Sequence, residues 1–185
     1  MSHTIDPTTQ DLLDFIAAGP TPRHCAAEAA RRLENHGFRA LDAGSRWALE
    51  EGQGYWLRDR GTLLAFRMGT ETTAEAGFRL LGAHTDSPNL RVKPQPDHGG
   101  NGYLQLGVET YGGLLDYSWL DKDLGLAGSV MVRTDDGVHP EERLVRIDRP
   151  VLRIPSLAIH LNRDVRKDGL KLNAQKHLPP ILGLG

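Results

Sequence analysis

The chain has one cysteine, Cys25, in 185 residues. This excludes an internal disulfide and a cysteine-based zinc cluster within the chain, and it fits a reducing compartment. Cys25 lies in an alanine-rich stretch with a helical pattern, which favours a small core residue over a nucleophile. The sequence also lacks a Gly-x-Ser-x-Gly motif, so neither a cysteine hydrolase nor a serine hydrolase is supported.

The chain also lacks an excess of charge of either sign and any long apolar run. Its net charge is −2 and its pI is about 6.4, with basic residues scattered among acidic ones. We therefore expect no nucleic acid partner and no polybasic membrane patch. No apolar segment approaches the length that spans a bilayer, and residues 1–10 have no apolar signal core. These absences predict a cytoplasmic protein.

The remaining composition is that of an ordinary globular protein. Hydrophobic residues make up 39% of the chain and charged residues 25%. Aromatic residues are sparse, at 6%, whereas 21 glycines and 11 prolines predict many turns rather than a helical bundle. The length is enough for one domain, or one domain and part of another. We expect a mixed α/β chain.

Two helices are predicted near the amino terminus. Residues 8–18 have the apolar spacing of a short amphipathic helix. Thr21 and Pro22 are typical of an N-cap and of the first position in a second helix. We expect that helix to run to about Asn35, before Gly37, and its small residues are suited to close packing on a sheet.

Beyond Gly54 the hydrophobic period changes to two, which is typical of strands. Residues 54–59 and 62–68 flank Arg60-Gly61 and predict a hairpin. The apolar run 77–84 (GFRLLGAH) predicts a buried strand. Further strands are expected at residues 90–93, 103–110, 128–134 and 142–148, with Asp136-Gly137 as the turn between the last two.

A polar motif, His84-Thr85-Asp86-Ser87-Pro88, follows the apolar run. Because side chains alternate along an extended backbone, His84 and Asp86 are expected to project to the same side. They come at the carboxyl end of the predicted strand, where open α/β sheets build their sites. An imidazole can bind a divalent metal while a carboxylate fixes its orientation. By spacing alone, a hydrogen-bonded core histidine and a turn-capping aspartate are the more frequent explanation.

The neighbouring residues reverse that preference, because they resemble the aspartyl aminopeptidase family. GAHTDSPNLRVKP (82–94) is similar to the first metal-binding motif of that family. The likeness continues in the family's order through VETYGG (108–113), WLDKDLGLAGSVMVR (119–133), RIDRPVLRIPSLAIHLNR (146–163) and HLPPIL (177–182). These blocks cover most of residues 77–182, and the first 76 residues are compatible with the family.

The resemblance implies a two-metal aminopeptidase that releases unblocked amino-terminal residues, often acidic ones, from peptides. His84 would bind one of two bridged ions, usually Zn2+ although other divalent metals are compatible, and Asp86 would be the carboxylate behind it. His160 matches a histidine that reaches into a neighbouring subunit and helps to hold the substrate carbonyl or its oxyanion. From the residues alone, His160 would be an ordinary half-buried strand histidine.

The resemblance also implies an architecture and an assembly. Residues 1–92 would be the start of an α/β/α two-metal peptidase domain. Residues 93–185 would form most of an inserted β-rich domain for dimerisation and substrate capping. Complete members form homo-oligomers, commonly dodecamers built from dimers.

Only the first, smaller share of a family member is matched, and the apolar end HLPPILGLG is typical of an interrupted chain. The further ligands would come from sequence beyond these motifs. Glu109, Asp121 and Asp123 are expected in structural hydrogen bonds or ion pairs, so the chain alone should be inactive. Two alternatives stay open: a non-catalytic oligomerisation module derived from the family, and an unrelated binding domain in which His-Thr-Asp is a coincidence.

Overall fold

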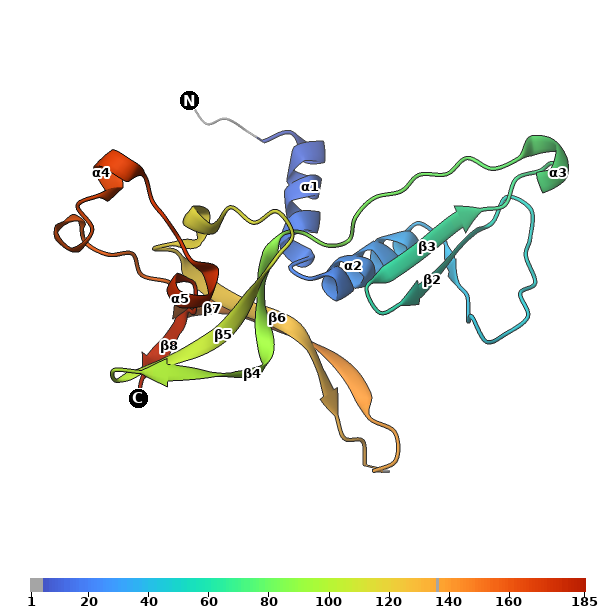
Figure 1. The fold of residues 1–185 in the computed structure, drawn as a ribbon. Coiled ribbons are helices and arrows are strands. Elements are labelled where there is room, and N and C mark those ends of the chain that lie inside the picture. The colour runs from blue at the N-terminus through green and yellow to red at the C-terminus, as the bar shows by residue number, and fades with distance from the viewer. Residues whose placement is uncertain (1–4, 136) are drawn as a thin grey trace. The chain divides into compact units, whose positions relative to one another are not determined.

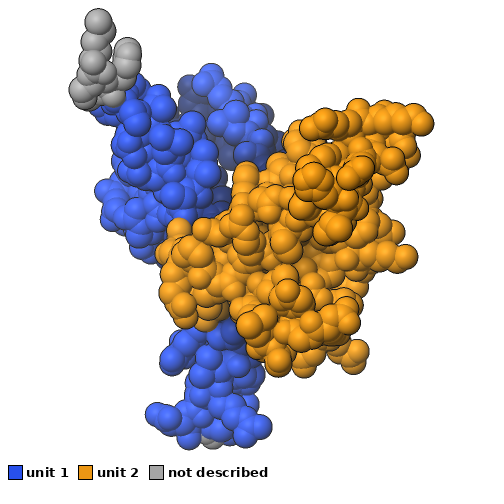
Figure 2. All heavy atoms as spheres, turned by 90° about the vertical axis from the view of Figure 1, so that its left-hand side faces the viewer, with its two compact units in different colours: residues 1–87, 128–144 blue, residues 88–127, 145–185 orange. Residues whose placement is uncertain are grey.

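The structure, a computed structural model, describes residues 5–135 and 137–185. The chain forms two compact units, which Figure 2 shows in different colours. Unit 1 comprises residues 1–87 and 128–144, and unit 2 comprises residues 88–127 and 145–185. Helices and strands occur along the whole described chain (Figure 1), so the mixed α/β class is confirmed. None of the helices in these ranges is both long enough and apolar enough to cross a membrane.

Both predicted helices are present, as α1 (Pro7–Ala18) and α2 (Pro22–Asn35). Each begins with proline at its first position, where a missing N–H costs nothing. The side chains of Asp6 and Thr21 cap them, accepting hydrogen bonds of 3.1 and 3.3 Å from backbone N–H groups of the first turn. Gly37 follows α2 with φ 80, a left-handed conformation that glycine adopts without strain.

The predicted hairpin of unit 1 is also confirmed. Its strands β2 (Gly54–Asp59) and β3 (Thr62–Arg67) are antiparallel, and β1 (Arg39–Ala40) pairs in parallel with β2. Helix α2 contacts β2 and β3. Ala26 and Ala30, at 0% and 5% exposure, make that approach possible because small side chains let a helix lie close to a sheet.

Tyr55 of β2 is the largest buried side chain in unit 1, with 2% of its surface exposed. Its ring centre lies 5.7 Å from that of Phe66 on the paired strand, and Phe66 in turn lies 6.3 Å from Trp47. Its hydroxyl accepts a hydrogen bond of 2.8 Å from the backbone N–H of Glu50. The apolar ring is therefore buried while its polar tip keeps a partner.

The prediction of a buried strand at residues 77–84 was wrong. This segment follows the short helix α3 (Thr73–Ala76) as an extended connection without strand pairing, and all its residues are exposed (Figure 1). An apolar run becomes a buried strand only if neighbouring strands take up its N–H and C=O groups. None of the strands in the described part of unit 1 does so.

The sheet of unit 2 has five strands in the described residues, in the order β4-β5-β8-β7-β6. All four predicted strands are found and each is longer than predicted, although the third ends at Val132 rather than at 134, and the last strand was not predicted. Asp136 lies outside the described residues, so the predicted turn is represented only by Gly137, with φ 66. The strands are β4 (Asn89–Gly100), β5 (Tyr103–Tyr111), β6 (Asp123–Val132), β7 (Glu141–Arg153) and β8 (Ile181–Leu184), of which β6 and β7 extend into residues 128–144 of unit 1.

Short helices connect these strands, and one apolar cluster forms the core of unit 2. The helices are η1 (Asp116–Trp119), η2 (Ile159–Leu161), α4 (Val165–Asp168) and α5 (Ala174–His177). Val108, Ile154 and Leu178 are the buried members of the cluster, with 4%, 0% and 0% of their surfaces exposed. Partly buried residues packed against them are Leu90, Trp119, Leu120, Leu124 and Ala174.

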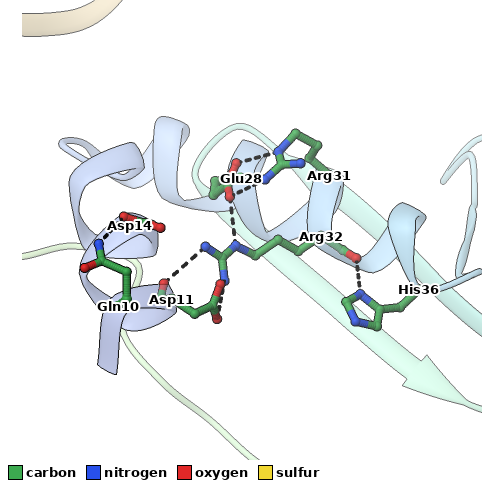
Figure 3. A network of polar contacts seen from close by, with 7 residues as sticks. All are labelled: Gln10, Asp11, Asp14, Glu28, Arg31, Arg32 and His36. Atoms are coloured by element: carbon green, nitrogen blue, oxygen red, sulfur yellow. Dashed lines mark hydrogen bonds and ion pairs between the residues drawn. The ribbon is translucent and has the colours of Figure 1, made fainter. Parts of the chain in front are cut away.

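Glu28 is the centre of a polar network between α1 and α2, drawn in Figure 3. It accepts hydrogen bonds of 2.7 and 2.6 Å from Arg31 and one of 2.8 Å from Arg32. Arg32 also donates two hydrogen bonds of 2.8 Å to Asp11 and thereby joins the two helices. The hydrogen bonds from Arg31, and then those from Arg32, lower the pKa of Glu28 to about 2.

Replacement of Glu28 should make the stability of unit 1 less dependent on pH. Because the folded state lowers this pKa from 4.5 to about 2, the charged carboxylate stabilises the fold above pH 4.5, and that stabilisation is lost as the pH falls towards 2. Glu28→Gln should cost about 1 kcal/mol near pH 6 and clearly less near pH 3. Urea unfolding at both pH values measures this, with the exposed Glu34→Gln of the same helix as control. An equal cost at both pH values would contradict the assignment.

Candidate functional site

His84 and Asp86 form a pair immediately after the exposed apolar run. Nδ1 of His84 lies 2.8 Å from Oδ1 of Asp86. The histidine side chain is 89% exposed and the aspartate side chain 28% exposed. The predicted proximity of the two side chains is confirmed, although the backbone that carries them is not a strand. The carboxylate occupies Nδ1, which leaves Nε2 as the nitrogen that can bind a ligand.

This pair has the donor chemistry of one zinc ligand with its supporting carboxylate. It does not make a complete metal centre, because a tight zinc site takes three or four protein ligands. Among residues 5–135 and 137–185, no group of three or more histidine, cysteine, aspartate and glutamate side chains could hold a metal ion. Within the described residues, the His84–Asp86 pair is therefore not part of a larger ligand cluster.

Glu109 and Asp123 have structural partners, as the sequence predicts. Glu109 lies 3.1 Å from Nζ of Lys93 and accepts a hydrogen bond of 3.1 Å from Gln175. These two contacts, that of Lys93 first, lower the pKa of Glu109. Asp123 accepts a hydrogen bond of 2.9 Å from Arg153. Both carboxylates are therefore engaged by side chains of unit 2.

Asp121, the third of these carboxylates, fixes the start of the segment that leads to His160. Its side chain accepts hydrogen bonds from the hydroxyl of Ser156 and, at 3.1 Å, from the backbone N–H of Ser156. These bonds lower the pKa of Asp121. Its own N–H donates to the carbonyl of Ile154 at 2.8 Å. Sequence reasoning missed this link, because Asp121 and Ser156 are 35 positions apart and no local pattern joins them.

His160 lies in the 3-10 helix η2 and is exposed, so it is not the half-buried strand histidine that the residues alone suggest. The flanking Leu157 and Leu161 are also exposed, at 64% and 75%. His160 belongs to unit 2, whereas His84 and Asp86 belong to unit 1. The structure thus brings together two of the three predicted site residues and presents the third on an exposed turn.

Cys25 and His177 both lie in helices, α2 and α5. Cys25 lies in α2, and burial raises the pKa of its thiol, which keeps it in the weakly reactive protonated form at neutral pH. His177 ends α5, and its Nδ1 accepts a hydrogen bond of 3.0 Å from the backbone N–H of Asn173. Cys25 is thus half-buried rather than fully enclosed in a core, and His177 has a backbone partner within its own turn.

In the described residues, a mixed α/β chain thus carries one histidine that a carboxylate orients, which is the donor chemistry of a single metal ligand. Comparison with known proteins gives the family. The family model of the aminopeptidase I zinc metalloproteases (M18) matches residues 15–185, and the chain belongs to this family.

Curated relatives show how much of a family member the chain represents. It is 51% identical over 177 residues to a probable M18 family aminopeptidase 2 of Streptomyces coelicolor, covering 96% of this chain and 40% of the relative. A protein of the same description from Pseudomonas aeruginosa is 51% identical over 174 residues, with 94% and 40% covered. The chain therefore spans about 40% of the length of the curated relatives it matches.

Solved structures support the fold. An Ape4 structure, determined in complex with Nbr1, superposes with a TM-score of 0.89 at 42% identity, covering 95% of this chain and 34% of that chain. The mApe1 of Chaetomium thermophilum gives 0.81 at 31% identity, with 95% and 40% covered. The mApe1 dodecamer of S. cerevisiae gives 0.78 at 30% identity, with 96% and 38% covered.

Proposed function

We propose that this chain is the amino-terminal part of a metal-dependent aminopeptidase that releases unblocked, often acidic, residues from peptides. The observation that carries this proposal is the contact of 2.8 Å between His84 and Asp86, in a chain whose residues 15–185 match the M18 family. The described residues lack a complete ligand set, and the chain covers only part of its relatives. The 185 residues alone are therefore proposed to be inactive.

The proposed roles follow from the geometry of each side chain. His84 would bind one zinc ion through Nε2, while Asp86 holds the proton on Nδ1 and fixes the ring. In the complete site, two bound ions would activate a bridging water and polarise the scissile carbonyl. His160, on its exposed turn, would donate a hydrogen bond to the carbonyl oxygen in the site of a neighbouring subunit.

The same proposal covers the architecture and the assembly. Residues 1–92 would begin the α/β/α peptidase domain, and residues 93–185 would form most of an inserted β-rich dimerisation domain. Homo-oligomerisation is supported by a structural neighbour that is a dodecamer. The protein would act in the cytoplasm on peptides small enough to enter such an assembly.

The test replaces His84 while the chain is co-expressed with the part of a family member that it does not match. We would co-express residues 1–185 with the section of the Streptomyces coelicolor relative that the chain does not match, and purify both polypeptides together. Zinc content and release of amino-terminal residues from peptides are measured. His84→Ala should lower activity more than 100-fold and reduce bound zinc, and Asp86→Asn should lower activity roughly 10- to 100-fold.

His98→Ala is the matched control, because His98 is an exposed histidine on β4 outside the proposed site. It should leave zinc content and activity unchanged. If His84→Ala has no more effect than this control, His84 is not a metal ligand. If the unsubstituted pair of polypeptides binds no zinc and has no activity but still forms oligomers in light scattering, the chain is an oligomerisation module.

A further inference from the structure

Asp121 and Ser156 form a hydrogen-bonded link beyond the end of β7, which we name the clamp. The Asp121 carboxylate accepts one hydrogen bond from the hydroxyl of Ser156 and one of 3.1 Å from its backbone N–H. The N–H of Asp121 donates a hydrogen bond of 2.8 Å to the carbonyl of Ile154. A single residue thus binds the backbone on both sides of Pro155, where the chain leaves the strand.

The backbone and the side chain of Asp121 are both constrained. Its φ is 57, a left-handed conformation that residues other than glycine, asparagine and aspartate rarely adopt. Residues in such a conformation persist where their surroundings hold them, often at functional sites. The guanidinium of Arg153 lies 3.8 Å from the Asp121 carboxylate and also donates a hydrogen bond of 2.9 Å to Asp123. The carboxylate therefore has partners in addition to Ser156.

The clamp stands at the start of a long connection that carries His160. Ile154 belongs to the apolar cluster of unit 2 and Ala174 packs against it, whereas none of residues 155–173 takes part. Hydrogen bonds within η2, from the N–H of Leu161 to Ala158 at 2.8 Å and from the N–H of Asn162 to Ile159 at 3.2 Å, fix the shape of the turn. They do not fix its position relative to the sheet.

The clamp shortens the free length of chain before His160. With it, the last fixed residue is Ser156, four positions before the histidine. Without it, the last fixed residue is Ile154, six positions before the histidine. Since an extended chain spans about 3.3 Å per residue, the reach of the turn would grow from roughly 13 Å to roughly 20 Å. The clamp thus restricts where His160 can lie.

We propose that Asp121 is a positioning residue for His160, because the clamp sets the point and direction from which η2 leaves the sheet. The inference rests on the role proposed above for His160, a hydrogen bond to the substrate carbonyl oxygen. A donor stabilises a transition state only when it is held in place, and a misplacement of about 1 Å can cost up to about 100-fold in rate. Asp121 itself touches no substrate in this role.

The first test measures 15N relaxation in the 185-residue chain. The order parameters of the Leu161 and Asn162 N–H groups should be about 0.85, and in Asp121→Gly they should fall below about 0.6. Glycine adopts the left-handed conformation without strain, so this variant removes the carboxylate alone. Ser156→Ala, which removes only the hydroxyl bond, should give intermediate values.

Asp121→Asn is the conservative variant. Asparagine tolerates the left-handed conformation, and its amide oxygen can accept the N–H of Ser156, so the order parameters should stay near those of the unsubstituted chain. Asp123→Ala is the matched control, because Asp123 accepts a hydrogen bond from Arg153 as part of the same group. Unchanged order parameters in Asp121→Gly, or an equal fall in Asp123→Ala, would overturn the proposal.

The second test measures kinetics after co-expression with the unmatched section of the Streptomyces coelicolor relative. Asp121→Gly should lower kcat about tenfold while KM and zinc content stay unchanged, and Asp121→Asn should restore most of the loss. In a His160→Ala background, Asp121→Gly should lower kcat no further. If the two effects multiply instead, Asp121 does not act through His160 and the positioning role is wrong.

The two tests separate this inference from the proposed function. Loss of order in Asp121→Gly, with no effect of His160→Ala on kcat, would uphold the clamp and refute the role proposed for His160. A complex without zinc and without activity would refute the proposed function and with it the catalytic purpose of the clamp. The relaxation measurement on the chain alone would still decide whether the clamp orders the turn.

Discussion

Ile154→Ala should destabilise unit 2 by about 3 kcal/mol, within the roughly 2–5 kcal/mol that truncation of a buried isoleucine costs. Ile154 is 0% exposed and contacts the cluster of Val108 and Leu178. The substitution removes three methyl or methylene groups and leaves a cavity that the surrounding sheet can fill only in part. Its carbonyl also accepts the N–H of Asp121, so relaxation of the backbone here would disturb the segment before His160.

Urea unfolding followed by hydrogen exchange in peptides of each unit measures this cost. The loss should be confined to peptides from 88–127 and 145–185. Ile147→Ala, the same change at a position of β7 that is 41% exposed, should cost less than about 1 kcal/mol. Equal costs for the two substitutions would show that Ile154 does not lie in a packed core.

Gly54→Ala should destabilise unit 1 by about 2 kcal/mol, although alanine is the smallest possible addition. A Cβ atom at Gly54 would lie 2.6–2.7 Å from three ring atoms of Phe38. The ring is itself covered, since the guanidinium carbon of Arg67 lies 5.0 Å from its centre. Arg67 is the residue paired with Gly54 in the β2–β3 register, so the ring lies over a strand pair that has room only for glycine.

Gly82→Ala is the control for this substitution, because a Cβ at Gly82 meets nothing within 4 Å. A second variant sharpens the test. Phe38→Leu should lower the cost of Gly54→Ala, since a smaller side chain leaves space for the added methyl group. If the two substitutions are additive in chemical denaturation, the steric explanation is wrong.

Local signals predicted the elements whose cause is local. Thr21-Pro22 marked the start of α2, and Arg60-Gly61 marked the hairpin turn, because capping and turn conformations depend on one or two residues. β8 was missed because ILGL has neither the length nor the alternation of a strand. Its strand conformation comes from pairing with residues of β5 and β7 that are far away in sequence.

Residues 77–84 show the opposite error, because a strand was predicted there and none is present. The composition of this segment is that of a buried strand. Composition alone, however, does not determine whether neighbouring strands are present to pair with the segment. The same distinction between local and long-range causes applies to the candidate site. The spacing of His84 and Asp86 predicted their contact, because it depends on two residues of one extended segment. The contact of Asp121 with Ser156 depends on the sheet of unit 2, which local sequence does not encode.

The position of β8 has a consequence for the order in which unit 2 folds during synthesis. β8 lies between β5 and β7, where Tyr103 pairs with Leu184 and Arg153 pairs with Ile181. On the ribosome, the hairpins β4–β5 and β6–β7 are translated long before residues 181–184 emerge. Until then, the edges of β5 and β7 that will pair with β8 have no partner. Open edges of this kind make folding slow and the intermediate prone to pair with other chains.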